Sequence, residues 1–162
     1  MKAIQSTAGL LRTACAATIL VFAAGQALAG ECPADKVKEN AVTSGKTEPV
    51  GVTDAVLASI DLSSKGDTFN GMTLRLRKLV IEPGGVVPWH EHSQRPANIY
   101  IISGTIEENR SSCMVPIVHK PGDVVSEFGA DLAHWWMNNG NEPVVLISAD
   151  LFADNMSKPD MM

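Results

Sequence analysis

Three of the chain's four histidines are spaced so that they could bind one metal ion. His90 and His92 lie two positions apart at the end of a β-branched stretch, and side chains two apart in a strand project from the same face. His134 lies far downstream, beyond turn residues at 121–123, so only a folded sheet can bring it beside the other two. Neutral imidazoles bind Fe, Cu, Zn, Ni and Mn, and three of them leave positions for water or substrate. We therefore predict a metal site made by these three histidines.

The segments that would position these histidines are short apolar or alternating runs separated by turn residues such as 83–85 and 121–123. About eight strands at this spacing, with almost no amphipathic helix, predict an all-β fold, either an antiparallel sandwich or a barrel. A closed barrel is favoured because it leaves no exposed sheet edge. The predicted strands cover residues within 56–62, 72–81, 86–92, 98–103, 114–118, 124–128, 133–137 and 144–151.

The N-terminus has the features of a secretory signal peptide. Lys2 and Arg12 precede an apolar run, and Ala27-Leu28-Ala29 fits the small-residue rule for cleavage after Ala29. A transmembrane anchor is the alternative, but the run is shorter than the roughly 20 residues that span a bilayer. We therefore expect a periplasmic or secreted protein. The predicted organisation is a signal peptide (1–29), an N-terminal arm (30–50), a single barrel domain (51–154) and a C-terminal tail (155–162).

The charge of the chain limits the partners that the mature protein can have. The formal net charge is −5, and removal of Lys2 and Arg12 with the signal peptide makes it more negative. A negative chain is a poor ligand for nucleic acid or for an anionic membrane surface. We therefore predict a small molecule as the binding partner.

Cys32 and Cys113 are the two cysteines that remain after cleavage. Export to an oxidising compartment favours a disulfide between them, which would tie the N-terminal arm to the barrel. Two unpaired buried thiols are the alternative.

The residues around the first two histidines resemble the first motif of the cupin family. That motif runs Gly, five residues, His-x-His, three or four residues, Glu, six residues, Gly. At those positions this chain has Gly84, His90, His92, Ala97 and Gly104, so the spacing is complete and Ala97 replaces the glutamate.

The second cupin motif ends in Pro-x-Gly-x-x-His-x-x-x-Asn. His134 and Asn138 match its last part, while Gly129 and Asp131 stand in place of the proline and the glycine. Together the two motifs cover roughly residues 84–138.

This resemblance implies a jelly-roll β-barrel with His90 and His92 on one strand pair and His134 on an opposed strand. It implies one divalent transition metal, with Fe, Cu or Zn as candidates, and it makes a homodimer possible. Without a carboxylate at Ala97, three imidazoles would give a softer, dicationic centre, and the short side chain would open space for substrate. Three-histidine members of the superfamily include dioxygenases that cleave small diketones or oxidise thiols.

Other residues are candidates for the substrate pocket. Trp136 shares the face of His134 and could wall the metal pocket, although core packing explains it equally well. Arg75 and Arg77 share one face of a predicted strand and could clamp a carboxylate if that face is inward. Leu74 and Leu76 occupy the opposite face and look like core, which favours an outward face for the arginines. We expect His119, next to a turn, to lie on the surface.

The leading functional hypothesis is an exported cupin that uses one metal in oxygen-dependent oxidation or cleavage of a small organic substrate. The alternative is a non-catalytic module that binds metal, a carboxylate or a sugar ligand. The sequence contains no Gly-x-Ser-x-Gly nucleophile elbow and no phosphate-binding glycine loop, so neither serine hydrolysis nor nucleotide binding is indicated.

Overall fold

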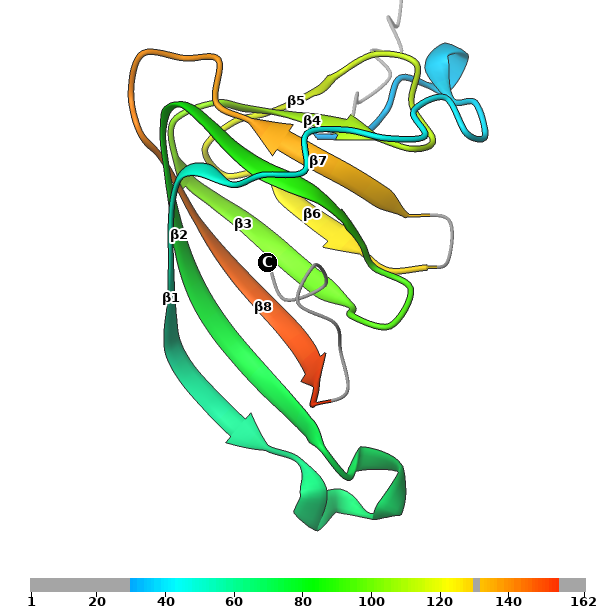
Figure 1. Ribbon diagram of the computed structural model, residues 1–162, viewed down its shortest axis with the longest axis vertical. Coiled ribbons are helices and arrows are strands. Elements are labelled where there is room, and N and C mark those ends of the chain that lie inside the picture. The colour runs from blue at the N-terminus through cyan, green and yellow to red at the C-terminus, as the bar shows by residue number, and fades with distance from the viewer. Residues whose placement is uncertain (1–29, 130–131, 155–162) are drawn as a thin grey trace, which may run out of the picture.

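The computed structural model describes residues 30–129 and 132–154, and they are built almost entirely of β-strands (Figure 1). The predicted signal peptide and C-terminal tail lie outside these residues. Short 3-10 turns occur at η1 (Ala34–Lys36), η2 (Ser63–Lys65) and η3 (Asp67–Phe69). The strands are β1 (Val50–Asp61), β2 (Met72–Glu91), β3 (Ala97–Ser103), β4 (Ile106–Arg110), β5 (Ile117–His119), β6 (Val124–Glu127), β7 (Ala133–Met137) and β8 (Val144–Ala153).

All eight strands belong to one antiparallel sheet with the order β5-β4-β7-β2-β8-β3-β6, and β1 adds to β2. The long strand β2 connects the two halves of the sheet, because it pairs with β8 through residues 72–81 and with β7 through residues 86–91. The sheet therefore curls into a half-barrel around a concave face (Figure 1). The predicted all-β class is confirmed. The expected closure is not seen among the described strands, since β5 and β6 end the sheet without pairing with each other.

The predicted turn at residues 83–85 was wrong, because β2 continues through it. Gly84 has φ 76°, which is a backbone conformation that favours glycine, and a Cβ on Gly85 would lie 2.7 Å from the carbonyl oxygen of Glu82. The glycines let β2 bend where it changes partners from β8 to β7. This bend carries the strand from one half of the sheet to the other and brings His90 opposite β7.

Strand β4 was not predicted, because its sequence Ile-Glu-Glu-Asn-Arg contains a single apolar residue. Only Ile106 and Glu108 on this strand are buried, and Glu108 is charged. A buried charged side chain at an inward position hides the alternating pattern on which strand prediction depends.

The apolar core lies on the concave face of the sheet. Buried positions alternate with exposed ones along β3 and β6 and with half-buried ones along β7 and β8, as expected for strands with one buried face. The core cluster is made of Leu79, Ile81, Val87, Ala97, Ile99, Ile101, Ile106, Val125, Trp136, Val144 and Leu146.

The N-terminal arm lies against residues 111–114, which follow β4, and against β2. A disulfide joins Cys32 to Cys113, with their Cα atoms 5.8 Å apart, and Val37 forms a β-bridge with Cys113. Further along the arm, the backbone N–H of Trp89 donates to the carbonyl of Lys46. The arm is thus fixed at both of its ends to the half-barrel. Within the described residues, no helix has the length and apolar character needed to cross a membrane.

Candidate metal centre

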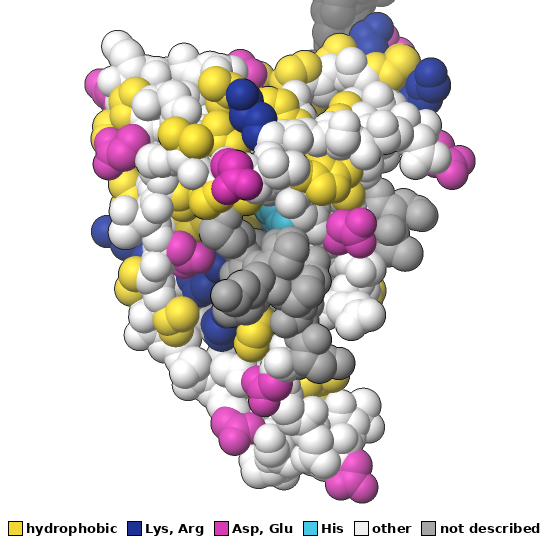
Figure 2. All heavy atoms as spheres, viewed as in Figure 1, with side chains coloured by type: hydrophobic (Ala, Val, Ile, Leu, Met, Phe, Trp, Pro, Cys, Tyr) yellow, Lys and Arg dark blue, Asp and Glu magenta, His cyan; other side chains and the backbone are white. Residues whose placement is uncertain are grey.

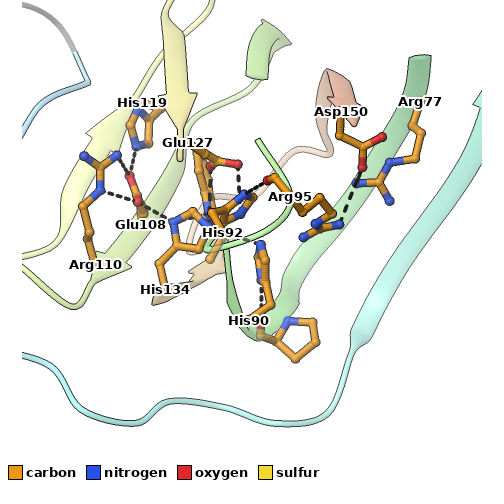
Figure 3. A network of polar contacts seen from close by, with 12 residues as sticks. Arg77, His90, His92, Arg95, Glu108, Arg110, His119, Glu127, His134 and Asp150 are labelled. Atoms are coloured by element: carbon orange, nitrogen blue, oxygen red, sulfur yellow. Dashed lines mark hydrogen bonds and ion pairs between the residues drawn. The ribbon is translucent and has the colours of Figure 1, made fainter. Parts of the chain in front are cut away.

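The three histidines singled out from the sequence lie together on the concave face (Figure 3). His90 on β2 and His134 on β7 are paired across the ladder, and their Nε2 atoms lie 3.2 Å apart. His92 follows the last residue of β2, and its ring centroid lies 4.9 Å from each of the other two. All three side chains are buried. The bend in β2 and the pairing of β2 with β7 therefore assemble a cluster whose ligand atoms fall within 4.8 Å of one another.

Hydrogen bonds at Nδ1 set the tautomer of each ring. The Nδ1–H of His90 donates to the carbonyl of Pro88 and that of His92 to the carbonyl of Arg95, each at 2.8 Å. The Nδ1–H of His134 donates to the carboxylate of Glu108 at 2.5 Å. A neutral imidazole that donates from Nδ1 has its lone pair on Nε2. All three Nε2 lone pairs are therefore available to a metal ion.

The electrostatic environment keeps the first two rings neutral. Burial, followed by the charge of His134 and His92, lowers the pKa of His90 well below its ordinary 6.5. Burial and the charge of His134 lower the pKa of His92 to about 3. Metal ligands must be unprotonated, so these shifts favour the ligating form.

Glu108, on β4, supports the cluster from behind and was missed by the sequence analysis. Its carboxylate is fully buried and accepts hydrogen bonds from His134 at one oxygen and from His119 Nε2, at 2.9 Å, at the other. Arg110 adds two hydrogen bonds, at 2.7 and 2.9 Å. Burial alone would raise the pKa of Glu108, but the hydrogen bonds from His119 and His134 lower it well below 4.5. This anion orients the ring of His134.

Glu127, on β6, is a second buried carboxylate that the sequence analysis missed. Its Oε2 lies 3.2 Å from His92 Nε2, and its Oε1 lies 3.6 Å from His134 Nε2. Burial raises the pKa of Glu127 from 4.5 to about 7. The alternation of buried Val125 and Glu127 along β6 is the one signal in the sequence that could have indicated an inward side chain.

A small cavity opens beside the histidine cluster, and Figure 2 shows a histidine at the bottom of a hollow on the viewed face. Polar atoms reach this cavity from His90, His92, Glu127, Arg77, Arg95 and Ser148. The rest of its wall is apolar and is formed by Leu79, Val87, Ile99, Trp136 and Leu146. Trp136 thus lines the cavity, and it also contacts His134, with ring centroids 5.6 Å apart. Ala97 is buried and does not line this cavity, but it borders a separate, more open hollow together with Glu127.

The preferred outward orientation of Arg75 and Arg77 was wrong. Arg77 is only 4% exposed and lines the cavity, while the leucines on either side of Arg75 face solvent, with Leu76 39% exposed. Arg75 pairs with Asp150 at 2.6 Å, and Arg77 pairs with both Asp54 and Asp150. These acidic partners come from β1 and β8, so the inward face became favourable for the arginines only after the strands were assembled.

Arg95 was not among the residues singled out from the sequence. It is 1% exposed and lies 3.7 Å from Asp150 at Nη1, and neither its Nε nor its Nη1 has a hydrogen-bond partner among the described residues. Burial and the neighbouring charge of Arg77 lower its pKa to about 10, so it stays cationic at neutral pH. A buried guanidinium with unused donors beside a cavity is suited to bind an anionic group.

The expectation that His119 lies on the surface was also wrong. It is fully buried on β5, where it donates to Glu108 and stacks on Trp136 with ring centroids 4.6 Å apart. The strand alternates inward Ile117, outward Val118 and inward His119, so the residue before the turn belongs to the concave face.

Comparisons with known proteins agree with this architecture. The family model described as "Cupin domain" (Cupin_2) matches residues 77–150. Auxin-binding protein ABP19b of Prunus persica is 33% identical over 79 residues, which cover 47% of this chain and 37% of that protein. The chain thus spans little more than a third of this curated relative.

Two solved structures are similar to this chain, and the first of them shows the likeness of fold. A predicted oxalate decarboxylase from Thermotoga maritima is 18% identical, with a TM-score of 0.50 over 66% of this chain and 92% of that chain. A protein with a double-stranded β-helix domain from Klebsiella pneumoniae is 19% identical, with a TM-score of 0.49 over 71% of this chain and 86% of that one. Together, the matched family model, the curled antiparallel sheet and the clustered motif histidines show that the chain belongs to the cupin superfamily.

Proposed function

We propose that this protein is an exported, metal-dependent oxidoreductase of the dioxygenase type that acts on a small organic anion. The observation that supports it best is the convergence of three Nε2 lone pairs, of His90, His92 and His134, beside a small cavity that also contains a buried arginine, Arg95. Imidazole nitrogens suit Fe, Cu and Zn, and we propose one such divalent ion per chain.

A redox-active metal in this site would polarise a chelating substrate and mediate its reaction with dioxygen. The chain's own residues have supporting tasks in that reaction. The hydrogen bonds at Nδ1 hold the three rings in position, and the apolar wall with Trp136 keeps water out of the cavity. Arg95 would bind the anionic group of the substrate and orient it.

The proposed reaction balances without a further reductant. Both atoms of dioxygen enter the product, and the electrons come from the substrate bond that is cleaved or from the sulfur that is oxidised. The cavity therefore needs to hold the substrate and dioxygen, and no additional cofactor.

Oxygen uptake tests this proposal. Protein loaded separately with Fe²⁺ or Cu²⁺ would be screened against diketones, flavonols, catechols and thiols, each as a neutral compound and as a carboxylated analogue. We expect uptake with a carboxylated member, incorporation of both labelled oxygen atoms, and loss of uptake in His90→Ala. Glu91→Gln is a matched control, because Glu91 is next to the same histidine but exposed. No uptake with any member by a protein that binds the metal would contradict the oxidoreductase proposal.

Arg95→Met tests the anionic substrate class. Asp150 also pairs with Arg75, at 2.6 Å, so it keeps an ion-pair partner when Arg95 is replaced. We expect the KM for the carboxylated substrate to rise while that for the neutral analogue stays the same. An equal change for both compounds would contradict a role of Arg95 in binding the anionic group.

A second candidate function is ligand binding without turnover. The likeness to a protein named for auxin binding favours it, although that likeness covers only 79 residues. Calorimetry with the same carboxylated panel distinguishes the two functions. Binding to the metal-loaded protein without oxygen uptake would support the binding function and contradict the oxidoreductase.

Export and assembly are further parts of the proposal. The disulfide between Cys32 and Cys113 is consistent with an oxidising compartment. We expect the mature chain from cell fractionation to begin at Gly30. We also propose a homodimer formed by a second copy on the outer face of β1 and β2, where Ile60 is 58% exposed and Leu74 42% exposed on an edge strand and its neighbour. A monomeric mass in light scattering would contradict the dimer.

A further inference from the structure

Glu127 occupies a position that the motif comparison does not assign to the metal centre. It lies at the last residue of β6, outside both motifs' ligand positions, and its side chain is 2% exposed. Its carboxylate faces the Nε2 atoms of His92 and His134, at 3.2 and 3.6 Å, from the side opposite to Glu108 (Figure 3). A buried carboxylate thus lies against two imidazole nitrogens.

A cation between these atoms would satisfy all of them at once. Since Nδ1 of both rings already donates to Arg95 O or to Glu108, both Nε2 atoms carry lone pairs, and lone pairs repel a carboxylate. Neither Nε2 of His92 nor Oε1 of Glu127 has a hydrogen-bond partner among the described residues. Buried polar atoms of this kind are costly unless another group binds them.

The donor spacings match one coordination sphere. Two ligands held about 2.1 Å from one ion at octahedral or tetrahedral angles lie about 3.0 to 3.4 Å apart. The Nε2 atoms of His90 and His134 lie 3.2 Å apart, and Glu127 Oε2 lies 3.2 Å from His92 Nε2, so both distances fall in this range. Glu127 Oε1, at 3.6 Å from His134 Nε2, is slightly farther away. The carboxylate therefore lies where a fourth protein ligand would lie.

The sheet explains how Glu127 reaches this place. Ala97, which stands where the family motif has its glutamate, is the direct cross-strand partner of Glu127 in the β3–β6 ladder. Side chains of directly opposed residues project from the same face, about 5 Å apart at Cβ. Both residues are buried on the concave face. A short side chain at Ala97 leaves room for the longer one across the ladder.

We propose that Glu127 is the fourth protein ligand of the metal held by His90, His92 and His134. In this arrangement Glu127 on β6 takes the place of the motif glutamate, whose position on β3 is occupied by Ala97. This inference rests on the proposed metal site. It changes the centre from a dication bound by neutral imidazoles alone to a centre of net charge one with a hard oxygen ligand. Carboxylates suit Mn²⁺ and other hard ions, so Glu127 extends the range of metals that the site accepts.

Metal titration of the purified full chain tests this inference. Mn²⁺ affinity would be measured by competition with a chelator for wild type, Glu127→Gln, His90→Ala and the control Glu91→Gln. We expect Glu127→Gln to weaken Mn²⁺ binding by at least roughly 10- to 100-fold. Loss of a residue that only hydrogen-bonds to a metal ligand already lowers metal affinity by this amount, so loss of a ligand should lower it at least as much. Glu91→Gln should bind like wild type. Wild-type affinity in Glu127→Gln would overturn the inference.

A transplant variant gives an independent test. Ala97→Glu combined with Glu127→Ala returns the carboxylate to β3 on the same face, and we expect it to recover most of the Mn²⁺ affinity lost in Glu127→Ala. No recovery in a double variant whose circular dichroism matches wild type would contradict the proposed exchange between strands. If the variants fail to fold, a crystal structure of the Mn²⁺-loaded wild type decides: a Glu127 oxygen about 2.2 Å from the metal supports the inference, and one beyond bonding distance overturns it.

The His90→Ala variant separates the two levels of the argument. Loss of Mn²⁺ binding in His90→Ala together with wild-type binding in Glu127→Gln would leave the metal site standing and reject Glu127 alone. Wild-type binding in both variants would reject the proposed metal site itself.

Discussion

Two buried glutamates contact the same histidine on opposite sides and have opposite protonation behaviour. Glu108 receives hydrogen bonds from His134 Nδ1, His119 and Arg110, and these lower its pKa despite burial. Glu127 faces Nε2 of the same His134, and burial raises its pKa to about 7. Both side chains are at most 2% exposed. Burial alone therefore does not determine the charge of a carboxylate.

The two nitrogens of the His134 ring therefore have different surroundings: Nδ1 is held by Glu108, whereas Nε2 faces Glu127. On the Glu108 side, every carboxylate oxygen has a donor, so the charge is stabilised by the protein itself. On the Glu127 side, the carboxylate needs either a proton or a cation. The fixed charge of Glu108 positions His134, whereas the charge of Glu127 would change with pH and with any cation bound beside Nε2.

The largest expected effect is on the Glu108 side. Glu108→Ala leaves Arg110, His119 and His134 without their shared acceptor, and removing one partner from a buried charge network costs about 3–5 kcal/mol. We expect the free energy of unfolding of the metal-free protein to fall by that amount in urea titrations. A loss below about 1 kcal/mol would mean that the hydrogen-bond network of Glu108 does not stabilise the fold.

Glu127→Gln should have the opposite sign in metal-free protein. Because its folded pKa of about 7 lies above the ordinary 4.5, Glu127 contributes stability that is complete below pH 4.5 and lost as the pH rises through 7. Glutamine does not titrate, so at pH 8 the variant should be more stable than wild type by about 3 kcal/mol, at roughly 1.4 kcal/mol per pKa unit. His134, Glu108, Arg95 and Arg110, which set this field, are the same in both proteins.

Urea unfolding in the presence of a chelator, at pH 4 and pH 8, checks this prediction. The two proteins should have nearly equal stability at pH 4, where the carboxyl is protonated in both the folded and the unfolded wild type. Equal stability of the two proteins at pH 8 would show that the pKa of Glu127 is not raised in the folded protein.

His119→Phe should have an intermediate effect. Phenylalanine keeps an aromatic ring against Trp136 but removes one of the donors to Glu108, and a hydrogen bond to a charged group contributes about 1.5–3 kcal/mol. We expect a loss of about 2 kcal/mol in the same unfolding assay. The double variant with Glu108→Ala should lose less than the sum of the two, because both changes break the same bond. Full additivity would argue against a shared network.

The smallest effect on stability is expected for a substitution at Glu107, the neighbour of Glu108 in the sequence. Glu107 points away from the concave face and receives a hydrogen bond from exposed Asn139. Glu107→Gln should change the free energy of unfolding by no more than about 0.5 kcal/mol, the usual range for surface substitutions. A large effect would mean that charge anywhere on β4, and not the partners of Glu108, determines stability.

Sequence patterns identified most of the strands and the histidine cluster because both depend on local spacing. Period-two alternation placed His90 and His92 on one face, and the motif spacing added His134 from a distant segment. The same alternation did not predict the orientation of Arg75 and Arg77. It shows that two side chains share a face of the strand, but not which face becomes the concave one. Apolar neighbours suggested the wrong face there.

The sequence by itself determined the all-β class, the histidine cluster and the missing glutamate at Ala97. Only the tertiary structure decided that Glu127 lies across from Ala97 and that Glu108 lies behind His134, because strand neighbours are set by the curl of the whole sheet. A buried carboxylate has no local sequence signature, since its stability depends on cationic and hydrogen-bond partners brought from other strands.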